Sequence, residues 1–449
     1  MRTAWCSAFL AFVLCSNGQT NGFAGTNILS HPLSRHDAVE IAMRQNSTVL
    51  RGRADLRATH GVEMQLRSTA MPRVVFSGFF NAKDPALANE PFLTSTNSFQ
   101  FPNQAWQADG QVQQPLYAGG KITSSLRSAK LTREQAILSF QSTVADALLS
   151  TRIAYDDVLV ARQQILVQEA SIKLLSNELE DVQRRFEAGT VPRFNVLRAE
   201  VELANARPKL ITARYQFRIA KNNLVNLLGY TLPRGVIDDI PLQLTDNLQA
   251  QPMDIDLSSA VGKALQQRPE LGALHKTERL RHEDIVTARA GNLPSLQGFG
   301  GYQFRSPNFT DDLTAGLHGW EAGISMSWSP WDGGATRGKI TEAEARHERS
   351  IVDIQDQQRQ IELEVRTAYS QFIEAQETLE SQKKVQEEAE EALRLAEARM
   401  HAGTGTQLDV LNAQTSLTDA RTTQVQALHD YSVARSRLMR AIGEDLQKD

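Results

Sequence analysis

Hydrophobic and polar residues divide the chain into two long helical stretches, each preceded by segments of alternating character. No Gly or Pro occurs between Gly120 and Gly189, or between Gly338 and Gly403. Each interval has room for one helix of roughly 65 residues, about 100 Å long. Hydrophobic residues recur every seven positions along both intervals, which favours coiled-coil packing, although a plain antiparallel helical hairpin gives the same heptads.

Four shorter helices are predicted around the long ones, near residues 47–70, 194–228, 270–292 and 407–442. A helix of about 35 residues cannot cover one of about 65. We therefore expect two short helices to stack end to end beside each long helix. Pro208 lies inside one of the short helices and predicts a bend there.

The segments before the long helices alternate with period two. Apolar residues of 320–329, including Trp320, Ile324 and Trp328, fall on one face, and Glu321 with several serines falls on the other. Segment 106–113 sets Trp106, Ala108, Gly110 and Val112 against Gln107, Asp109, Gln111 and Gln113. An apolar face edged by aromatics opposite a polar face is typical of barrel strands between lipid and water, although a soluble amphipathic sheet remains an alternative. Partner strands are expected near 73–82 and 296–304.

The unit of strand, long helix, tight turn and short helix occurs twice. We call the turn between the long and the short helix the tip. Phe186 to Thr190 (sequence FEAGT) matches Met400 to Thr404 (MHAGT), and Leu228-Gly229 matches Ile442-Gly443, both at an offset of 214. Upstream of the strands the offset is 222, so the first copy carries about eight extra residues in a loop. We therefore expect a signal peptide at 1–24, a first repeat at 25–229, a linker at 230–256 that packs around the waist of the helices, a second repeat at 257–443 and a tail at 444–449.

The N-terminus has the pattern of an export signal: Arg2, an apolar run and small residues near Ala24. Cys6 and Cys15, the only cysteines, fall inside it, and the bulky Leu14 argues against lipidation of Cys15. A mature chain without cysteine excludes disulfides and thiolate chemistry. No apolar stretch reaches 18 residues, which excludes a helical membrane span, whereas barrel strands give a weaker signal.

The remaining chemistry points away from catalysis. The net charge of −4 gives no reason to expect nucleic-acid binding. His275 and His282 are seven residues apart, but no third ligand follows at metal-site spacing, so they are interpreted as surface histidines. No nucleotide-binding or hydrolase motif occurs. We expect neither an enzyme nor a cofactor or metal.

The chain resembles the TolC-like outer-membrane efflux proteins (outer membrane factors) over nearly all of its mature length. The resemblance rests on the duplicated strand–helix plan, on the two Ala-Gly-Thr tips, and on the Gly119-Gly120 and Gly333-Gly334 turns. It implies a mixed fold: a membrane β-barrel continued by a long α-helical coiled-coil barrel. Four strands cannot close a barrel, so three chains with twelve strands are expected.

The family resemblance also implies partners and a location. It implies a homotrimer in the outer membrane, with a helical tunnel in the periplasm that conducts substrates passively. An inner-membrane transporter supplies the energy through a periplasmic adaptor protein. The expected adaptor-docking tips are Gly189, Thr190, Val191, Pro192, Gly403, Thr404, Gly405 and Thr406. The expected aromatic girdle in the outer-membrane lipid is Trp106, Trp320 and Trp328.

The resemblance places a periplasmic gate at the start of the last helix. Asp409 matches an acidic position of the family, whereas Asn412 and the first-copy counterpart Asn195 depart from it, which predicts a single, weaker ring of carboxylates. The alternative interpretation of Asp409 is an acid favoured by a helix N-terminus. The alternative function is a periplasmic coiled-coil scaffold or adaptor without a pore, which leaves the Trp-edged strands unexplained.

Overall fold

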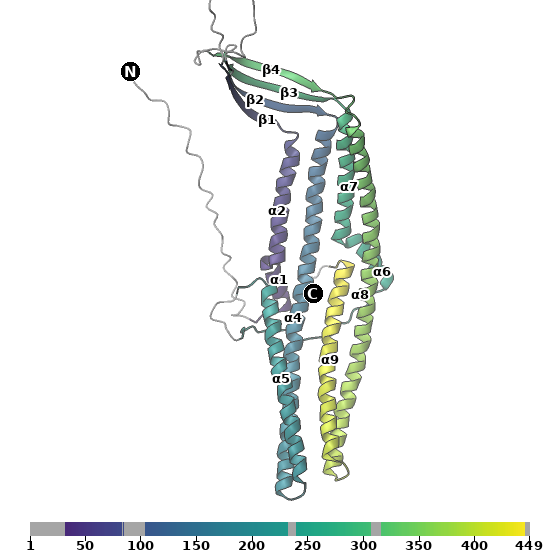
Figure 1. Ribbon diagram of the computed structural model, residues 1–449. Helices are drawn as coiled ribbons and strands as arrows, with labels where there is room; N and C mark the ends of the chain where they lie inside the picture. Colours follow the sequence, from purple (N-terminus) through teal and green to yellow (C-terminus); the bar gives the residue numbers. More distant parts are fainter. Residues whose placement is uncertain (1–31, 83, 85–103, 232–238, 307–315, 445–449) are drawn as a thin grey trace, which may run out of the picture.

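The computed structural model describes residues 32–82, 84, 104–231, 239–306 and 316–444. A four-stranded sheet stands at one end of an elongated layer of helices (Figure 1). The strands are β1 (Arg73–Ala82), β2 (Gln104–Ala118), β3 (Ser295–Arg305) and β4 (Leu317–Ser327). The helices are α1 (Arg35–Gln45), α2 (Ser47–Ser68), α4 (Lys121–Glu187), α5 (Arg193–Leu227), α6 (Leu257–Gln267), α7 (Pro269–Arg289), α8 (Ala335–His401) and α9 (Gln407–Ile442), with a 3-10 turn η1 (Ala290–Asn292). The expected signal peptide, with Cys15, and the tail beyond residue 444 lie outside the described residues.

The two expected long helices are α4 and α8, each of 67 residues. The sequence had indicated that the second long helix begins after Gly338. Helix α8 begins earlier, at Ala335, and Gly338 lies inside it. The earlier start has a local cause. The Asp332 carboxylate accepts hydrogen bonds from the backbone N–H groups of Gly334 and Thr336, at 3.1 and 2.8 Å, and these caps begin the helix.

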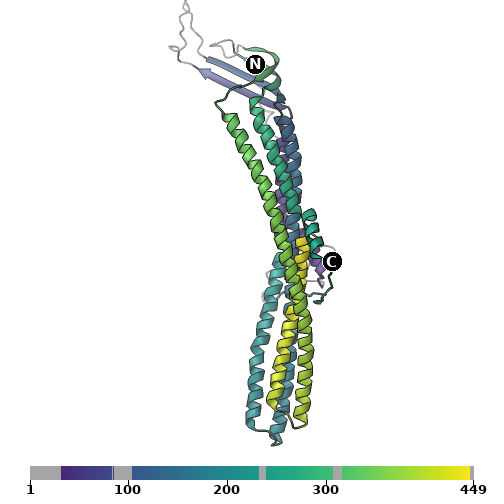
Figure 2. The same ribbon diagram turned by 90° about the vertical axis from the view of Figure 1, so that its right-hand side faces the viewer.

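The short helices stack end to end beside the long ones, as predicted. Helices α2 and α5 both run along α4, and α7 and α9 lie between α4 and α8 (Figures 1 and 2). The layer is therefore α2–α4–α7–α8 in its upper half and α5–α4–α9–α8 in its lower half. Helix α5 is continuous through Pro208, and a bend there stays a prediction.

The sequence did not predict two short helices that the structure contains, α1 and α6. Helix α1 precedes α2, with Asn46 as the single residue at their joint. Helix α6 precedes α7, with Arg268 as the single residue at their joint. Asn46 accepts from Thr48 N at 2.7 Å and donates to the carbonyl of Leu227 at 2.6 Å. It therefore ties the N-terminus of α2 to the C-terminus of α5, with which α2 is stacked.

The two largest hydrophobic clusters surround these joints at mid-height of the molecule. One joins α1, α4 and α5 to the segment around Ile240 and Leu242, and the other joins α6 to α8 and α9. The Tyr155 hydroxyl lies 2.9 Å from Leu33 O and 2.8 Å from the Asp246 carboxylate, so α4 holds the described part of the linker, residues 239–256, against the helices. None of the described helices is both long and apolar enough to cross a membrane.

The sheet has the order β1-β2-β3-β4, and every neighbouring pair is antiparallel. Pairing of β2 with β3 joins the two repeats, with a register shift between Pro115 and Tyr117. The sheet is continuous across the duplication, so its two outer edges belong to β1 and β4.

Candidate functional site

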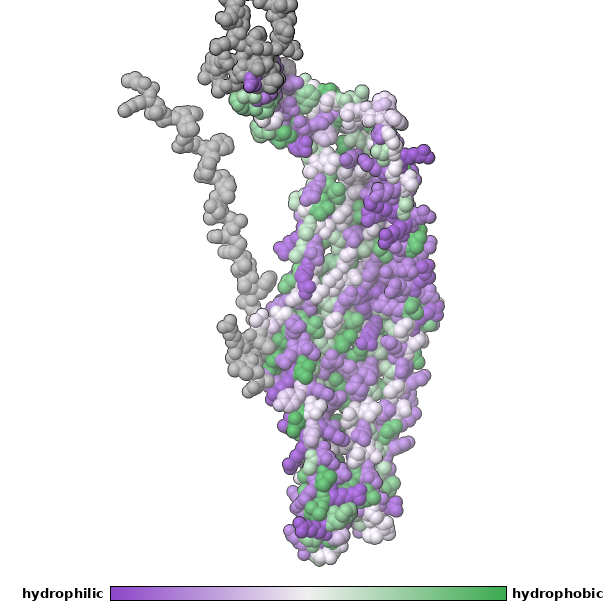
Figure 3. All heavy atoms as spheres, viewed as in Figure 1, coloured by the Kyte–Doolittle hydropathy of each residue, from purple (hydrophilic) through white to green (hydrophobic). Residues whose placement is uncertain are grey.

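One face of the sheet is apolar across all four strands. Residues paired across strands share a face, and the register aligns one row of Phe76, Gly110, Tyr302 and Trp320. Phe76 is 83% exposed and Trp320 80% exposed. Figure 3 shows hydrophobic residues on the visible part of the sheet. Such exposure of large apolar side chains indicates a surface that another apolar phase covers.

The other face of the sheet is mainly polar. The matching row there is Ser77, Asp109, Gln303 and Gly319. The alternation predicted for the strands around Trp106 and Trp320 is therefore present. Val75, Phe79 and Phe299 fall on the polar face, as exceptions in the partner strands.

The three tryptophans expected in the aromatic girdle occupy different places. Trp320 in β4 pairs with Tyr302 toward the loop end of the sheet, and Trp106 in β2 pairs with Phe80 near the same end. Trp328 follows β4 at the helical end, where its Nε1 donates to Asn292 O at 3.2 Å. The two ends of the apolar face thus both carry tryptophan.

The free edges of the helical layer each carry an exposed apolar stripe. The edge stripe of α5 lies opposite the residues that pack on α4 and consists of Phe194, Leu197, Val201, Ile211, Tyr215 and Ile219. The edge stripe of α8 lies opposite the residues that pack on α7 and α9 and consists of Val352, Leu363, Val385 and Leu395. Within the described residues no element of the chain covers either stripe.

The two tips turn by the same backbone geometry. Gly189 and Gly403 have φ of 74° and 75°, which permits the left-handed turn after each long helix. Thr190 N donates to Arg185 O at 2.9 Å, and Thr404 N donates to Arg399 O at 2.9 Å. The 214-residue offset therefore relates equivalent turns.

The tips differ in how the next helix starts. In the first copy Val191 leads to Pro192, which stands at the N-cap of α5 without a side-chain cap. In the second copy Gly405 leads to Thr406, which caps α9 together with Asp409. The second tip thus carries a negative charge bound into its helix start.

The Asp409 carboxylate takes part in a capping box. Its Oδ2 accepts from Thr406 N at 2.9 Å and from the Thr406 hydroxyl at 2.8 Å. The backbone and then the side-chain hydrogen bond of Thr406 lower the pKa of Asp409, so this exposed group is ionised at neutral pH. Helix capping, the alternative interpretation, accounts for its local contacts. Asn412 is exposed one turn later, and the Asn195 carbonyl lies 3.4 Å from Gln407 Nε2.

A polar seam joins the two tip hairpins, and the sequence interpretation missed it. We define the tip seam as Ser171 and Glu178 of α4 with Gln407 and Thr418 of α9. The Thr418 hydroxyl donates to Ser171 Oγ at 3.0 Å, and the Gln407 side chain acts on the Glu178 carboxyl and lowers its pKa. Between these contacts lies the apolar pair Leu175 and Leu411. Heptad positions in α4 indicate a buried face, but no sequence pattern says that α9 lies opposite it.

The histidines that the sequence singled out do not converge on a metal site in the described residues. The His282 ring packs edge-on against His347 at 5.7 Å between ring centroids. His347 Nε2 in turn lies 2.6 Å from the Glu278 carboxylate. These contacts tie α7 to α8.

Known proteins resemble this chain in sequence. The family model described as "Outer membrane efflux protein" matches residues 38–230 and 260–444. The outer membrane protein TolC of Vibrio cholerae is 26% identical over 389 residues, which cover 85% of this chain and 84% of TolC. The alkaline protease secretion protein AprF of Pseudomonas aeruginosa is 25% identical over 378 residues, which cover 83% of this chain and 76% of AprF.

Solved structures share the fold. The outer-membrane channel OprN superimposes with a TM-score of 0.75 at 20% identity, covering 92% of this chain and 90% of OprN. The outer membrane protein VceC of Vibrio cholerae gives a TM-score of 0.75 at 18% identity, covering 92% of this chain and 96% of VceC. The duplicated sheet and helical layer are therefore a recurrent architecture.

Proposed function

The chain belongs to the outer membrane efflux protein family and is an outer-membrane exit channel of the efflux or type I secretion kind, and on that premise we propose that three copies close into one duct. This proposal rests on the outer edges of the sheet and of the helical layer, which have no partner in the described chain. Strands β1 and β4 each lack a partner on one side within the described sheet, and α5 and α8 each present an apolar stripe. Joining β4 to the next copy's β1, and α8 to the next copy's α5, completes all of these edges at once.

The closed ring has a defined inside. The row of Phe76, Tyr302 and Trp320 faces lipid, and the row of Ser77, Asp109 and Gln303 faces the water-filled interior. Trp106 and Trp320 anchor one membrane interface and Trp328 the other. A polar interior has little selectivity, so transport is passive and an inner-membrane transporter selects the substrate.

The tips are the periplasmic end, where an adaptor protein docks. Both tips are exposed, lie at the far end of the layer from the sheet and repeat the same turn (Figure 1). Three copies offer six such turns to a helical-hairpin partner. The competing function, a scaffold without a pore, leaves the exposed apolar face of the sheet without a covering phase.

Charging the edge stripe of α5 tests ring closure. We expect the double substitution Ile211→Asp and Tyr215→Asp to prevent trimer formation, because two carboxylates then enter an apolar seam. The molar mass of detergent-extracted protein, measured by light scattering, reports the assembly. Gln216→Asp adds a charge to an exposed neighbour outside the stripe and should leave the trimer intact. A trimer in the double variant, or wild-type protein in the soluble periplasmic fraction, contradicts the proposal.

A second substitution tests the gate. We expect Asp409→Ala to raise single-channel conductance in planar bilayers and to weaken block by divalent cations, because three carboxylates leave the entrance. Asp409→Ala also removes the acceptor of the α9 capping box, so Asn412→Asp is the matched variant. It adds a carboxylate without touching the cap and should strengthen divalent block. Unchanged block in both variants would count against a carboxylate ring and leave Asp409 as a helix cap.

A further inference from the structure

Two acceptor oxygens of the tip seam are buried without a donor. Glu178 is 7% exposed, and its Oε1 has no hydrogen-bond partner among the described residues. The same holds for Oε1 of Gln407, whose side chain lies close enough to act on the Glu178 carboxyl and donates through Nε2 to Asn195 O at 3.4 Å. Buried acceptors without a donor are costly, and here two of them belong to side chains already in contact.

A proton on Glu178 supplies the missing donor. A neutral carboxylic acid has one O–H, and with it an acid and an amide can pair reciprocally, each donating to the other. An ionised Glu178 offers acceptors alone, so it leaves the Gln407 carbonyl unpaired.

The surroundings of Glu178 favour the neutral form. Burial raises the pKa of its carboxyl, Asp181 on α4 and Glu397 on α8 raise it further, and Arg185 and the Gln407 hydrogen bond oppose them without cancelling the rise. Arg185 also binds the Asp181 carboxylate at 2.7 Å, which divides its charge between two acids.

The tip seam is more polar than the contact inside the second hairpin. The α8–α9 contact is built by Leu393, Val410 and Leu417. Between the hairpins, the apolar pair of Leu175 and Leu411 is flanked by the hydroxyl pair of Ser171 and Thr418. The charge state of Glu178 therefore acts on the contact between the hairpins.

We propose that Glu178 is a proton-dependent clasp between the two hairpins. With its proton it pairs with Gln407 and holds α9 against α4. Without the proton the carboxylate is buried beside two other acids, and the contact weakens. The seam is therefore most stable below the usual pKa of a glutamate and loosens as pH rises through the raised pKa of Glu178. The consequence for the channel entrance rests on the proposed function, but the clasp itself does not.

A distance measurement tests the clasp without requiring a pore. Spin labels are placed on cysteines at the exposed helix ends, Ala188→Cys and Ala402→Cys, in a chain whose two native cysteines lie at positions 6 and 15. Electron–electron distance distributions are then recorded in detergent between pH 4.5 and 8.5. We expect the tip-to-tip distances to lengthen and broaden as pH rises.

The neutral amide variant separates the clasp from other effects of pH. Glu178→Gln keeps the shape and can donate to Gln407 at every pH, so its distances should stay short throughout. Glu180→Gln, which removes the same charge from an exposed position of α4, should keep the wild-type response. If Glu178→Gln misfolds, as far-ultraviolet circular dichroism would show, Gln407→Leu replaces it, and its distances should be long at both ends of the range.

Wild-type distances that do not change with pH, or a pH response that persists in Glu178→Gln, overturn the clasp. Neither result bears on the duct, which the trimer and membrane measurements test separately.

Discussion

Gly229→Ala is expected to destabilise the chain far more than the same change at either tip. Gly229 ends α5 at φ of 72°, and a Cβ built on it would lie 2.2 Å from Gln45 O and 2.8 Å from Gln45 C. Those atoms belong to the α1–α2 joint, where Asn46 ties two stacked helices together. Backbone atoms cannot rotate away, so the stacked helices must separate and the Asn46 bond to Leu227 O, at 2.6 Å, is lost.

The expected loss has two parts. A left-handed alanine costs about 1 kcal/mol, and overpacking against backbone costs a further ~1–3 kcal/mol. Gly189→Ala and Gly403→Ala are matched controls, because these glycines have φ of 74° and 75° with nothing within 4 Å of the added Cβ. They should show the first part alone. Urea unfolding of the purified variants provides the measurement, and equal losses at all three positions would show that the close approach at Gly229 has no energetic consequence.

The repeat in the sequence predicts that Gly229 follows a helix end, but it does not predict the close contact with Gln45 that disfavours any other residue there. Leu228-Gly229 and Ile442-Gly443 match at the 214-residue offset, and both glycines have positive φ at the ends of stacked helices. At Gly443 the nearest atoms to an added Cβ, in Gln267 and Arg268, lie at 3.4 Å. The two copies therefore differ in packing where their sequences agree, and only the structure distinguishes them.

The long helices and strands were predictable because their signals are long and local. An interval of 67 residues without a helix breaker specifies one helix whatever surrounds it. Helices α1 and α6, of 11 residues each, were missed because short apolar patterns fit several structures. A usable signal was present for α1, since Ser34 and Asp37 form a capping box. For Asp409, the Thr406 three residues before it gave the same signal for a helix cap.

Contacts between the repeats could not be read from the sequence. Ser171 meets Thr418, and Asp146 meets Arg440, across separations of 247 and 294 residues. A heptad shows that a face is buried but not which helix covers it. The order α5–α4–α9–α8, which the polar contacts depend on, results from the packing of the whole layer.

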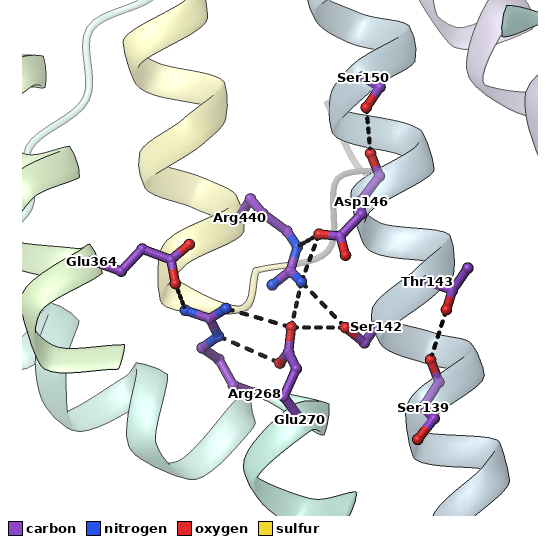
Figure 4. Close-up of polar contacts among 9 residues, drawn as sticks. All are labelled: Ser139, Ser142, Thr143, Asp146, Ser150, Arg268, Glu270, Glu364 and Arg440. Atoms are coloured by element: carbon purple, nitrogen blue, oxygen red, sulfur yellow. Dashed lines mark hydrogen bonds and ion pairs between the residues drawn. The ribbon is translucent and has the colours of Figure 1, made fainter. Parts of the chain in front are cut away.

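The ionic network at the α6–α7 joint is expected to make the fold sensitive to acid. Glu270 lies between Arg440 and Arg268, both nearly buried, and accepts from the Ser142 hydroxyl at 2.8 Å (Figure 4). Arg440 also binds Asp146 at 2.8 Å, so the network joins α4, α7 and α9, and Arg268 extends it to Glu364 of α8. This network lies at the α6–α7 joint of the second repeat, which corresponds to the α1–α2 joint that Asn46 holds in the first repeat.

The pKa of Glu270 fixes the direction of the pH dependence. Burial alone would raise the pKa of this carboxyl, but hydrogen bonds from Arg440 and Arg268 outweigh burial and lower the pKa from 4.5 to about 2. A carboxyl with a lowered pKa contributes stability that is complete above its unfolded value and is lost as pH falls toward its folded value. Wild-type protein should therefore lose on the order of 3 kcal/mol of unfolding free energy from this group between pH 4.5 and about 2.

Glu270→Gln should remove that pH dependence and lower stability at neutral pH by ~3 kcal/mol, because two buried guanidinium groups lose their shared carboxylate. Urea unfolding at pH 7, 4.5 and 3 measures both effects. Asp284→Asn is the matched control: its partner Arg281 lies at 3.1 Å on the exposed side of α7, with side chains 43% and 49% exposed, and the change should stay within about 0.5 kcal/mol. A Glu270→Gln variant that is as stable as Asp284→Asn at pH 7, with an undiminished loss in acid, would show that helix packing holds this joint without the network.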